Sequence, residues 1–278
     1  FAAPLLRKEF SNGKKIKSAT AYITAHGLYE AQINGKRVGD AYLTPGWTSY
    51  NKRLQYQAYD VTSLLKDGAN AIAVTLGDGW YRGNFSFDHR RNIYGKDIAL
   101  LLQLDIIYTD GTTATIASDA SWKSSTGAIR ANGIYQGEII DARMEKNGWT
   151  VAGYDDKNWT AVKTANFSKE ILIATYNEPI KKHETFTNGK VIITPKKEKV
   201  IDFGQNLVGW VQVKVKGKAG DTIKVSHAEV LDKNGNFYTE NLRNAKAQSV
   251  YILKGNGEEI FEPHFTFFGF RYIKVEGI

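Results

Sequence analysis

The sequence contains no cysteine and only one methionine among its 278 residues. Without cysteine the chain can form neither a disulfide framework nor a thiolate metal site, and it has no thiol nucleophile. Its five histidines, at positions 26, 89, 183, 227 and 264, are far apart and do not have the spacing of a metal-binding motif. We therefore expect no metal site and no cofactor.

Long apolar runs are also missing. No stretch approaches the roughly 18 apolar residues that cross a bilayer as a helix, so we expect no membrane partner. The first residues, Phe1–Arg7, lack the basic segment and apolar core of a secretion signal. Since the chain does not begin with Met, a signal removed earlier is compatible with the sequence, and we expect a periplasmic or extracellular location rather than a cytoplasmic one.

The chain has 37 basic and 29 acidic residues, a formal net charge of +8. Such an excess raises the question of an anionic partner, such as nucleic acid or an acidic polysaccharide. The lysines, however, are scattered in doublets beside turn residues, as at Lys14–Lys15 and Lys196–Lys197, and no basic helix accompanies them. We interpret them as solvated loop and edge-strand positions and expect no nucleic-acid partner.

Strict alternation of apolar and polar residues dominates the chain, as in Ala19–Ala25 and Leu54–Tyr59. This period of two predicts strands with one buried face. The pair Asn34-Gly35 predicts a hairpin because both turn positions tolerate positive φ, and similar pairs recur along the chain. Helical windows are scarce, with one short turn expected near Val61–Leu65. The pattern predicts an all-β protein built from sandwiches or jelly rolls.

The length predicts two hydrophobic cores. The segment Tyr154–Trp159 is typical of the end of a jelly roll, with an acidic turn that leads to an aromatic anchor. Proline restricts the backbone in Asn177–Pro179, where the next unit is expected to open. We therefore predict a jelly-roll, carbohydrate-binding-like domain over residues 1–168 and a second β-sandwich domain over residues 169–278.

Several motifs, in the same order and spacing, resemble the region that precedes the catalytic domain of bacterial α-L-rhamnosidases. They are Pro45–Arg53, Gly77–Gly83, Arg91–Gly95, Asp202–Trp210, His227–Leu231, Tyr238–Arg243 and Glu262–Tyr272. The resemblance covers nearly the whole chain. It implies a parent protein that removes terminal α-L-rhamnose with inversion, using carboxyl groups on a helical barrel. Nothing here matches that barrel, which would be a partner within the parent chain.

Glycosidases normally need two carboxyl groups that face each other across the scissile bond. The candidates in this chain do not form such a pair. Glu138 and Asp141 are three residues apart, which places them on opposite faces of a strand. Asp141 and Arg143 are instead expected to form an ion pair between a loop and the sheet. We therefore predict no catalytic residue here and a fragment that is inactive alone.

Two stretches of the first domain mix aromatic and polar side chains in the way that a sugar site requires. The candidate carbohydrate-binding residues are Trp47, Tyr50, Asn51, Asp78, Trp80, Tyr81, Arg82, Arg91, Asn92 and Tyr94. The alternative interpretation is that Trp47 and Trp80 close the ends of the sandwich. Some rhamnosidases use calcium in the corresponding domain, but here Lys52 follows Asn51, and a lysine disfavours a cation.

Three functions remain open from the sequence. The first is an accessory, non-catalytic region that supports the barrel and contacts substrate near its mouth. The second is a stand-alone carbohydrate-binding module that recognises a rhamnose-containing glycan. The third is a purely structural scaffold, which predicts an apolar docking surface on the second sandwich.

Overall fold

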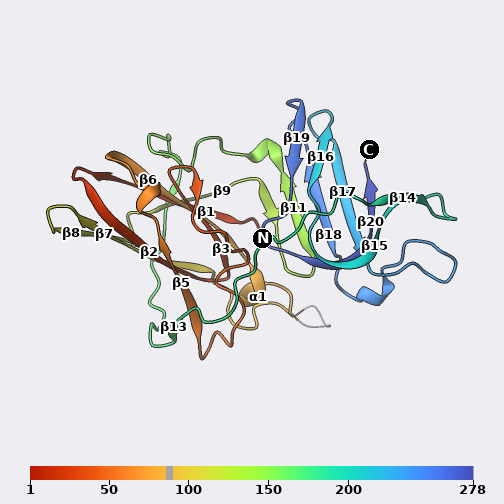
Figure 1. The fold of residues 1–278 in the computed structure, drawn as a ribbon, viewed down its shortest axis with the longest axis horizontal. Helices are drawn as coiled ribbons and strands as arrows, with labels where there is room; N and C mark the ends of the chain where they lie inside the picture. Colours follow the sequence, from red (N-terminus) through yellow and green to blue (C-terminus); the bar gives the residue numbers. More distant parts are fainter. Residues whose placement is uncertain (86–89, 278) are drawn as a thin grey trace.

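The computed structural model describes residues 1–85 and 90–277. Two β-sandwiches lie side by side, with the N-terminus between them (Figure 1). The predicted all-β class, a jelly roll followed by a second sandwich, is confirmed. The helical segments of the described ranges are single turns: η1 (Thr62–Leu64), α1 (Gly79–Arg82), η2 (Ala142–Met144) and η3 (Glu240–Leu242). The turn expected near Val61–Leu65 is therefore present.

The first sandwich, the jelly roll, has two sheets. One follows the order β12 (Thr160–Ala161), β9 (Lys123–Thr126), β1 (Pro4–Asn12), β6 (Gly68–Gly77), β3 (Leu28–Ile33) and β4 (Lys36–Arg37). The other follows β13 (Leu172–Ala174), β5 (Leu54–Asp60), β2 (Ile16–His26), β7 (Ala99–Tyr108) and β8 (Thr113–Ala117).

Alternating side chains from both sheets fill the core between them. Ala19, Ala21 and Ile23 of β2 are buried, as their period of two predicts. They pack in one cluster with the fully buried Trp122. The hairpin at Asn34-Gly35 is confirmed, since both residues have positive φ and Ile33 pairs with Lys36 across the turn.

The second sandwich is built on one larger sheet. Its order is β10 (Ile129–Ala131), β11 (Gly137–Asp141), β18 (Gln248–Ile252), β17 (Thr222–Ala228), β20 (Phe268–Glu276), β15 (Lys199–Gly209) and β14 (Lys190–Ile193). A two-stranded sheet of β16 (Val213–Lys216) and β19 (Glu258–Phe261) completes it.

The chain exchanges strands between the two sandwiches. β11 precedes the end of the jelly roll in sequence, yet it pairs in parallel with β18 of the second sandwich. β13 pairs in parallel with β5 of the jelly roll, although it follows residue 168. Each unit therefore depends on a strand from beyond its sequence boundary. The division at 168/169 stays a prediction.

Gly137 makes the entry of β11 into the second sheet possible. It has a φ of +92°, and a Cβ at this position would overlap the backbone carbonyl of Gln248. A glycine can adopt this left-handed backbone and approach a neighbouring strand without steric conflict. The parallel pairing of β11 with β18 begins at these two residues.

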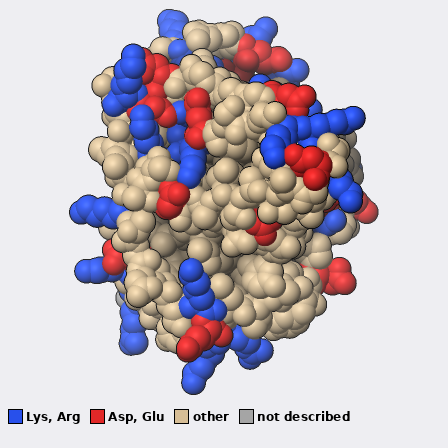
Figure 2. All heavy atoms as spheres, turned by 90° about the vertical axis from the view of Figure 1, so that its left-hand side faces the viewer, with Lys and Arg blue, Asp and Glu red and all other residues tan. Residues whose placement is uncertain are grey.

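Charged residues of both signs mix on the outer end of the jelly roll. Figure 2 shows Lys and Arg beside Asp and Glu around a largely uncharged centre. Lys14 pairs with Asp110, and Lys8 with Asp119. Within residues 1–85 and 90–277, no helix has the length and apolar character to cross a membrane.

Candidate carbohydrate-binding site

The two candidate stretches meet in one aromatic cluster. The rings of Trp47 and Trp80 stack with centroids 6.2 Å apart, and Trp47 Nε1 donates a hydrogen bond of 3.3 Å to the hydroxyl of Tyr94. Tyr50 meets Tyr81 and Tyr94 edge-on at 5.5 Å and 4.9 Å. The structure thus brings five of the candidate aromatic residues together from segments that are up to 47 positions apart.

Most of these rings are buried, which limits what a ligand can reach. Trp80 is 8% exposed, and Tyr50 and Tyr81 are less exposed still. Trp47 is 52% exposed and lies over Trp80, with Phe85 edge-on beside it at 5.1 Å. Phe85 did not figure among the sequence candidates. Among the described rings of this cluster Trp47 is therefore the most exposed, and it lies over the buried ring of Trp80.

Asp78 and two arginines form a separate clamp on the N-terminus. The Asp78 carboxylate is fully buried; it accepts a hydrogen bond of 2.8 Å from Arg82 Nε and one of 2.6 Å from Arg91 Nη2. The backbone nitrogen of Phe1 lies 3.9 Å from the same carboxylate. Both guanidinium groups also lie over the Phe1 ring, at 4.9 Å and 5.0 Å from its centroid. These charges are engaged in contacts within the protein.

The remaining candidates lie in exposed turns. Asn51 is followed by the exposed Lys52 and Arg53, whose backbone N–H groups both donate to the Ser49 carbonyl. Asn92 is exposed and has a φ of +59°. Calcium prefers several converging oxygen ligands. The described residues of the Asn51 turn do not fit that requirement, because two cationic side chains follow Asn51 directly.

A buried carboxyl group lies away from this cluster, where the two sandwiches meet. Glu138 of β11 accepts hydrogen bonds from the backbone N–H groups of His264 (2.8 Å) and Phe265 (2.6 Å). Burial raises the pKa of Glu138 to about 7. The Thr266 hydroxyl donates to the Ile134 carbonyl at 2.7 Å beside it. The loop before β20 is thereby fixed to β11 and the chain that leads into it.

The side chain of His264 connects this loop to the jelly roll. Its Nδ1 lies 2.9 Å from the Glu30 carboxylate, and Arg37 lies 3.0 Å from the same group. Burial favours the neutral form of His264, but the charge of Glu30 outweighs it and raises the pKa to about 9. Burial would raise the pKa of Glu30, yet His264 and Arg37 lower it to about 2.

Two aspartates of the motifs form ion pairs with arginines nearby. Arg143 donates to both carboxylate oxygens of Asp141, each at 2.8 Å, which confirms the predicted ion pair. Asp202 accepts a bidentate pair from Arg271 at 2.8 and 2.9 Å, and it also accepts the Gly204 N–H. Gly204 has a φ of +80° within the irregular part of β15.

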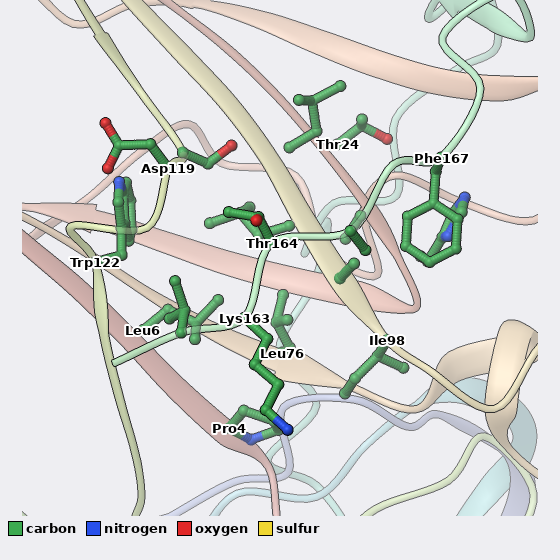
Figure 3. A pocket seen from close by; sticks show the side chains of 18 of the residues that line it. Pro4, Leu6, Thr24, Leu76, Ile98, Asp119, Trp122, Lys163, Thr164 and Phe167 are labelled. Atoms are coloured by element: carbon green, nitrogen blue, oxygen red, sulfur yellow. The ribbon is translucent and has the colours of Figure 1, made fainter. Parts of the chain in front are cut away.

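The structure also contains two cavities that the sequence did not indicate. One, of about 480 Å³, lies in the jelly roll beneath the chain around Thr164 and Phe167 (Figure 3). The other, of about 930 Å³, lies between residues 180–187 and the second sandwich. In its wall Glu262 accepts hydrogen bonds from Lys182 at 2.7 Å and from Trp210 Nε1 at 3.0 Å. Both cavities are formed by distant segments, which leave no local pattern.

Two family models match the chain in succession. Residues 14–184 match the α-L-rhamnosidase N-terminal domain, and residues 192–278 match the bacterial α-L-rhamnosidase concanavalin-like domain.

Curated relatives and solved structures agree with these matches. An α-L-rhamnosidase of Streptomyces avermitilis is 47% identical over 99% of this chain but only 27% of its own length. Another, from Formosa agariphila, is 38% identical over 98% of this chain and 30% of its own length. A structure of the Streptomyces enzyme complexed with L-rhamnose is similar, with a TM-score of 0.95 and 45% identity over 100% of this chain and 27% of that one. A structure of an α-L-rhamnosidase from Aspergillus terreus has a TM-score of 0.94 and 45% identity, over 99% of this chain and 32% of that one. The chain spans under a third of these proteins and belongs to the α-L-rhamnosidase family.

Proposed function

We propose that this chain is the non-catalytic N-terminal region of a glycosidase that removes terminal α-L-rhamnose. The observation that carries the proposal is the coverage. Nearly all of this chain aligns with the curated relatives, yet the aligned part is only 27–30% of their length. Cleavage with inversion would then use carboxyl groups that lie outside these 278 residues.

The environment of Glu138 supports this proposal. A pKa near 7 would suit a general acid, but such a group must also reach substrate. Glu138 is 2% exposed, its two oxygens accept backbone N–H groups, and it lines neither of the two cavities described above. The buried carboxylate instead fixes the loop before β20 to β11, where the two sandwiches meet.

Support of a catalytic portion would use the apolar surface of the second sandwich. Val191 and Ile193 of β14 and Val208 of β15 are largely exposed, Val208 by 80%. Exposed apolar side chains on neighbouring strands favour contact with another domain. In a protein that continues beyond residue 278, Val208→Lys should lower the temperature of thermal inactivation. In the 278-residue chain the same change should leave the melting temperature unaltered; equal behaviour in both would contradict a docking role.

Sugar binding is the second component of the proposal, with the exposed face of Trp47 as its platform. Aromatic faces receive the apolar face of a pyranose. Calorimetry with L-rhamnose should give saturable heat that Trp47→Ala removes, whereas glucose should give none. Tyr22→Ala is a suitable control because Tyr22 is an exposed aromatic residue on β2 outside the cluster. No heat at millimolar rhamnose would leave the chain a scaffold.

A further inference from the structure

The 480 Å³ cavity of the jelly roll lies between the two sheets and the strap, residues 160–169, that crosses them. Leu6, Leu76, Ile98 and Trp122 line its interior, while Thr164 and Phe167 come from the strap (Figure 3). Its volume lies within the range of small-molecule sites, about 300–1,000 Å³. The Trp47 cluster contributes no ring to this lining.

One side chain of the cavity wall carries a nitrogen that has no partner and is itself shielded from solvent. His26, at the end of β2, lines the cavity and is 8% exposed. Its Nδ1 has no hydrogen-bond partner among the described residues. A buried polar atom left unpaired costs free energy, which a ligand group that reaches it can recover. Burial lowers the pKa of His26, so the imidazole is neutral near pH 7.

The imidazole lies in an aromatic slot. It stacks on Tyr81 at 4.6 Å, nearly parallel, and meets Phe167 edge-on at 4.4 Å. Phe167 belongs to the exposed strap, so a movement of this ring uncovers the imidazole. Aromatic surroundings of this kind favour a flat apolar ligand.

Three polar side chains of the lining, Thr24, Ser118 and Asp119, are already occupied. The Thr24 hydroxyl donates to the Gln55 carbonyl at 2.6 Å, and Ser118 accepts the Leu102 N–H at 3.0 Å. Asp119 accepts from Lys8 and from the backbone of Ser121. A sugar needs partners around its whole hydroxyl rim, whereas Leu6, Leu76, Ile98 and Trp122 make the inner wall apolar, with the unpaired imidazole nitrogen of His26 available to a single hydroxyl.

We propose that this cavity binds a neutral phenol, with its ring among the apolar side chains and its hydroxyl hydrogen-bonded to the imidazole of His26. The site is separate from the rhamnose platform and does not depend on it. Binding is non-covalent and requires the strap to admit the ligand.

The probe is 4-methylphenol, titrated into the full 278-residue chain and followed by ligand-observed NMR and by the imidazole signals of His26. Saturable binding is expected, with 4-methylanisole about fivefold weaker because it cannot donate a hydrogen bond. His26→Phe keeps a ring in the slot and should reduce the affinity for 4-methylphenol to that for 4-methylanisole. Equal affinities for both probes in the unmodified protein would overturn the proposal.

Three further variants locate the site. Thr164→Trp should fill the cavity and weaken 4-methylphenol binding at least about tenfold, whereas Thr113→Trp, at an exposed position of β8, should not. Trp47→Ala should leave 4-methylphenol binding unchanged, so failure of rhamnose binding and failure of this proposal are distinguishable. Absence of 4-methylphenol binding, or tighter binding of L-rhamnose that Thr164→Trp removes, would contradict the phenol assignment.

Discussion

Glu138 and His264, 126 residues apart, are joined where the two sandwiches meet: the Glu138 carboxylate accepts the backbone N–H of His264 at 2.8 Å. The His264 side chain in turn reaches Glu30 of the jelly roll. One loop of the second sandwich is thus held from both sides. Stability of the whole chain should depend on the protonation of these groups.

The free energy of unfolding should fall as the pH rises from about 5 to 9. The pKa of Glu138 is raised to about 7 in the folded protein, so its ionisation above the unfolded value near 4.5 costs stability, up to ~3 kcal/mol by pH 7. The pKa of His264 is raised to about 9, so its contribution is complete below 6.5 and lost through 9. The side chain of His264 is 43% exposed, so screening reduces that second part.

Urea denaturation at pH 5, 7 and 9 measures this dependence. Glu138→Gln should remove the fall between pH 5 and 7 while keeping the fall between 7 and 9. The Glu30 carboxyl, with its pKa lowered to about 2, contributes stability that is lost below pH 4.5. A free energy of unfolding that is constant from pH 5 to 9 would contradict the roles of Glu138 and His264.

Gly137→Ala should destabilise the chain by about 3 kcal/mol or more, because the new Cβ meets the Gln248 carbonyl and the φ is +92°. Gly148→Ala is the matched control, with a φ of +80° but open space around the Cβ. It should cost about 1 kcal/mol. Thermal denaturation of the two variants separates the cost of the steric contact with Gln248 from the cost of the positive φ. Equal losses of stability would show that β11 can shift away from β18.

Asp78→Ala should cost about 3–5 kcal/mol, because it leaves Arg82 and Arg91 without their buried partner. The exposed pair of Lys14 and Asp110 provides the control, and Asp110→Ala should cost no more than about 1 kcal/mol. Chemical denaturation at pH 7 measures both variants. A loss for Asp78→Ala as small as that of the control would mean that the N-terminal clamp contributes little.

The strand exchange predicts one cooperative unfolding transition for both sandwiches. β11 and β13 each complete a sheet of the other unit, so neither sheet stays intact when the other unit unfolds. Scanning calorimetry should give a calorimetric enthalpy equal to the van't Hoff enthalpy. Two separated transitions would instead favour independent units divided near residue 168.

Local pattern sufficed for the strands, for the turn at Asn34-Gly35 and for the pair of Asp141 and Arg143, because each depends on residues close in sequence. It did not reveal that β11 joins a distant strand. Parallel pairing with β18 spans more than 100 residues and is decided by packing. Likewise, Asp78 next to Trp80 suggested a sugar site, whereas its carboxylate binds the side chains of Arg82 and Arg91.

The decisive measurement is the hydrolysis of an aryl α-L-rhamnoside by the purified 278-residue chain. We expect no release of the aryl alcohol above the uncatalysed rate at any pH between 4 and 8, since catalysis would use carboxyl groups outside this chain. A Glu138→Gln sample, assayed in parallel, checks the buried carboxyl group of Glu138, whose pKa lies near 7. Saturable release that co-purifies with the chain and disappears in Glu138→Gln would show that this region is itself catalytic.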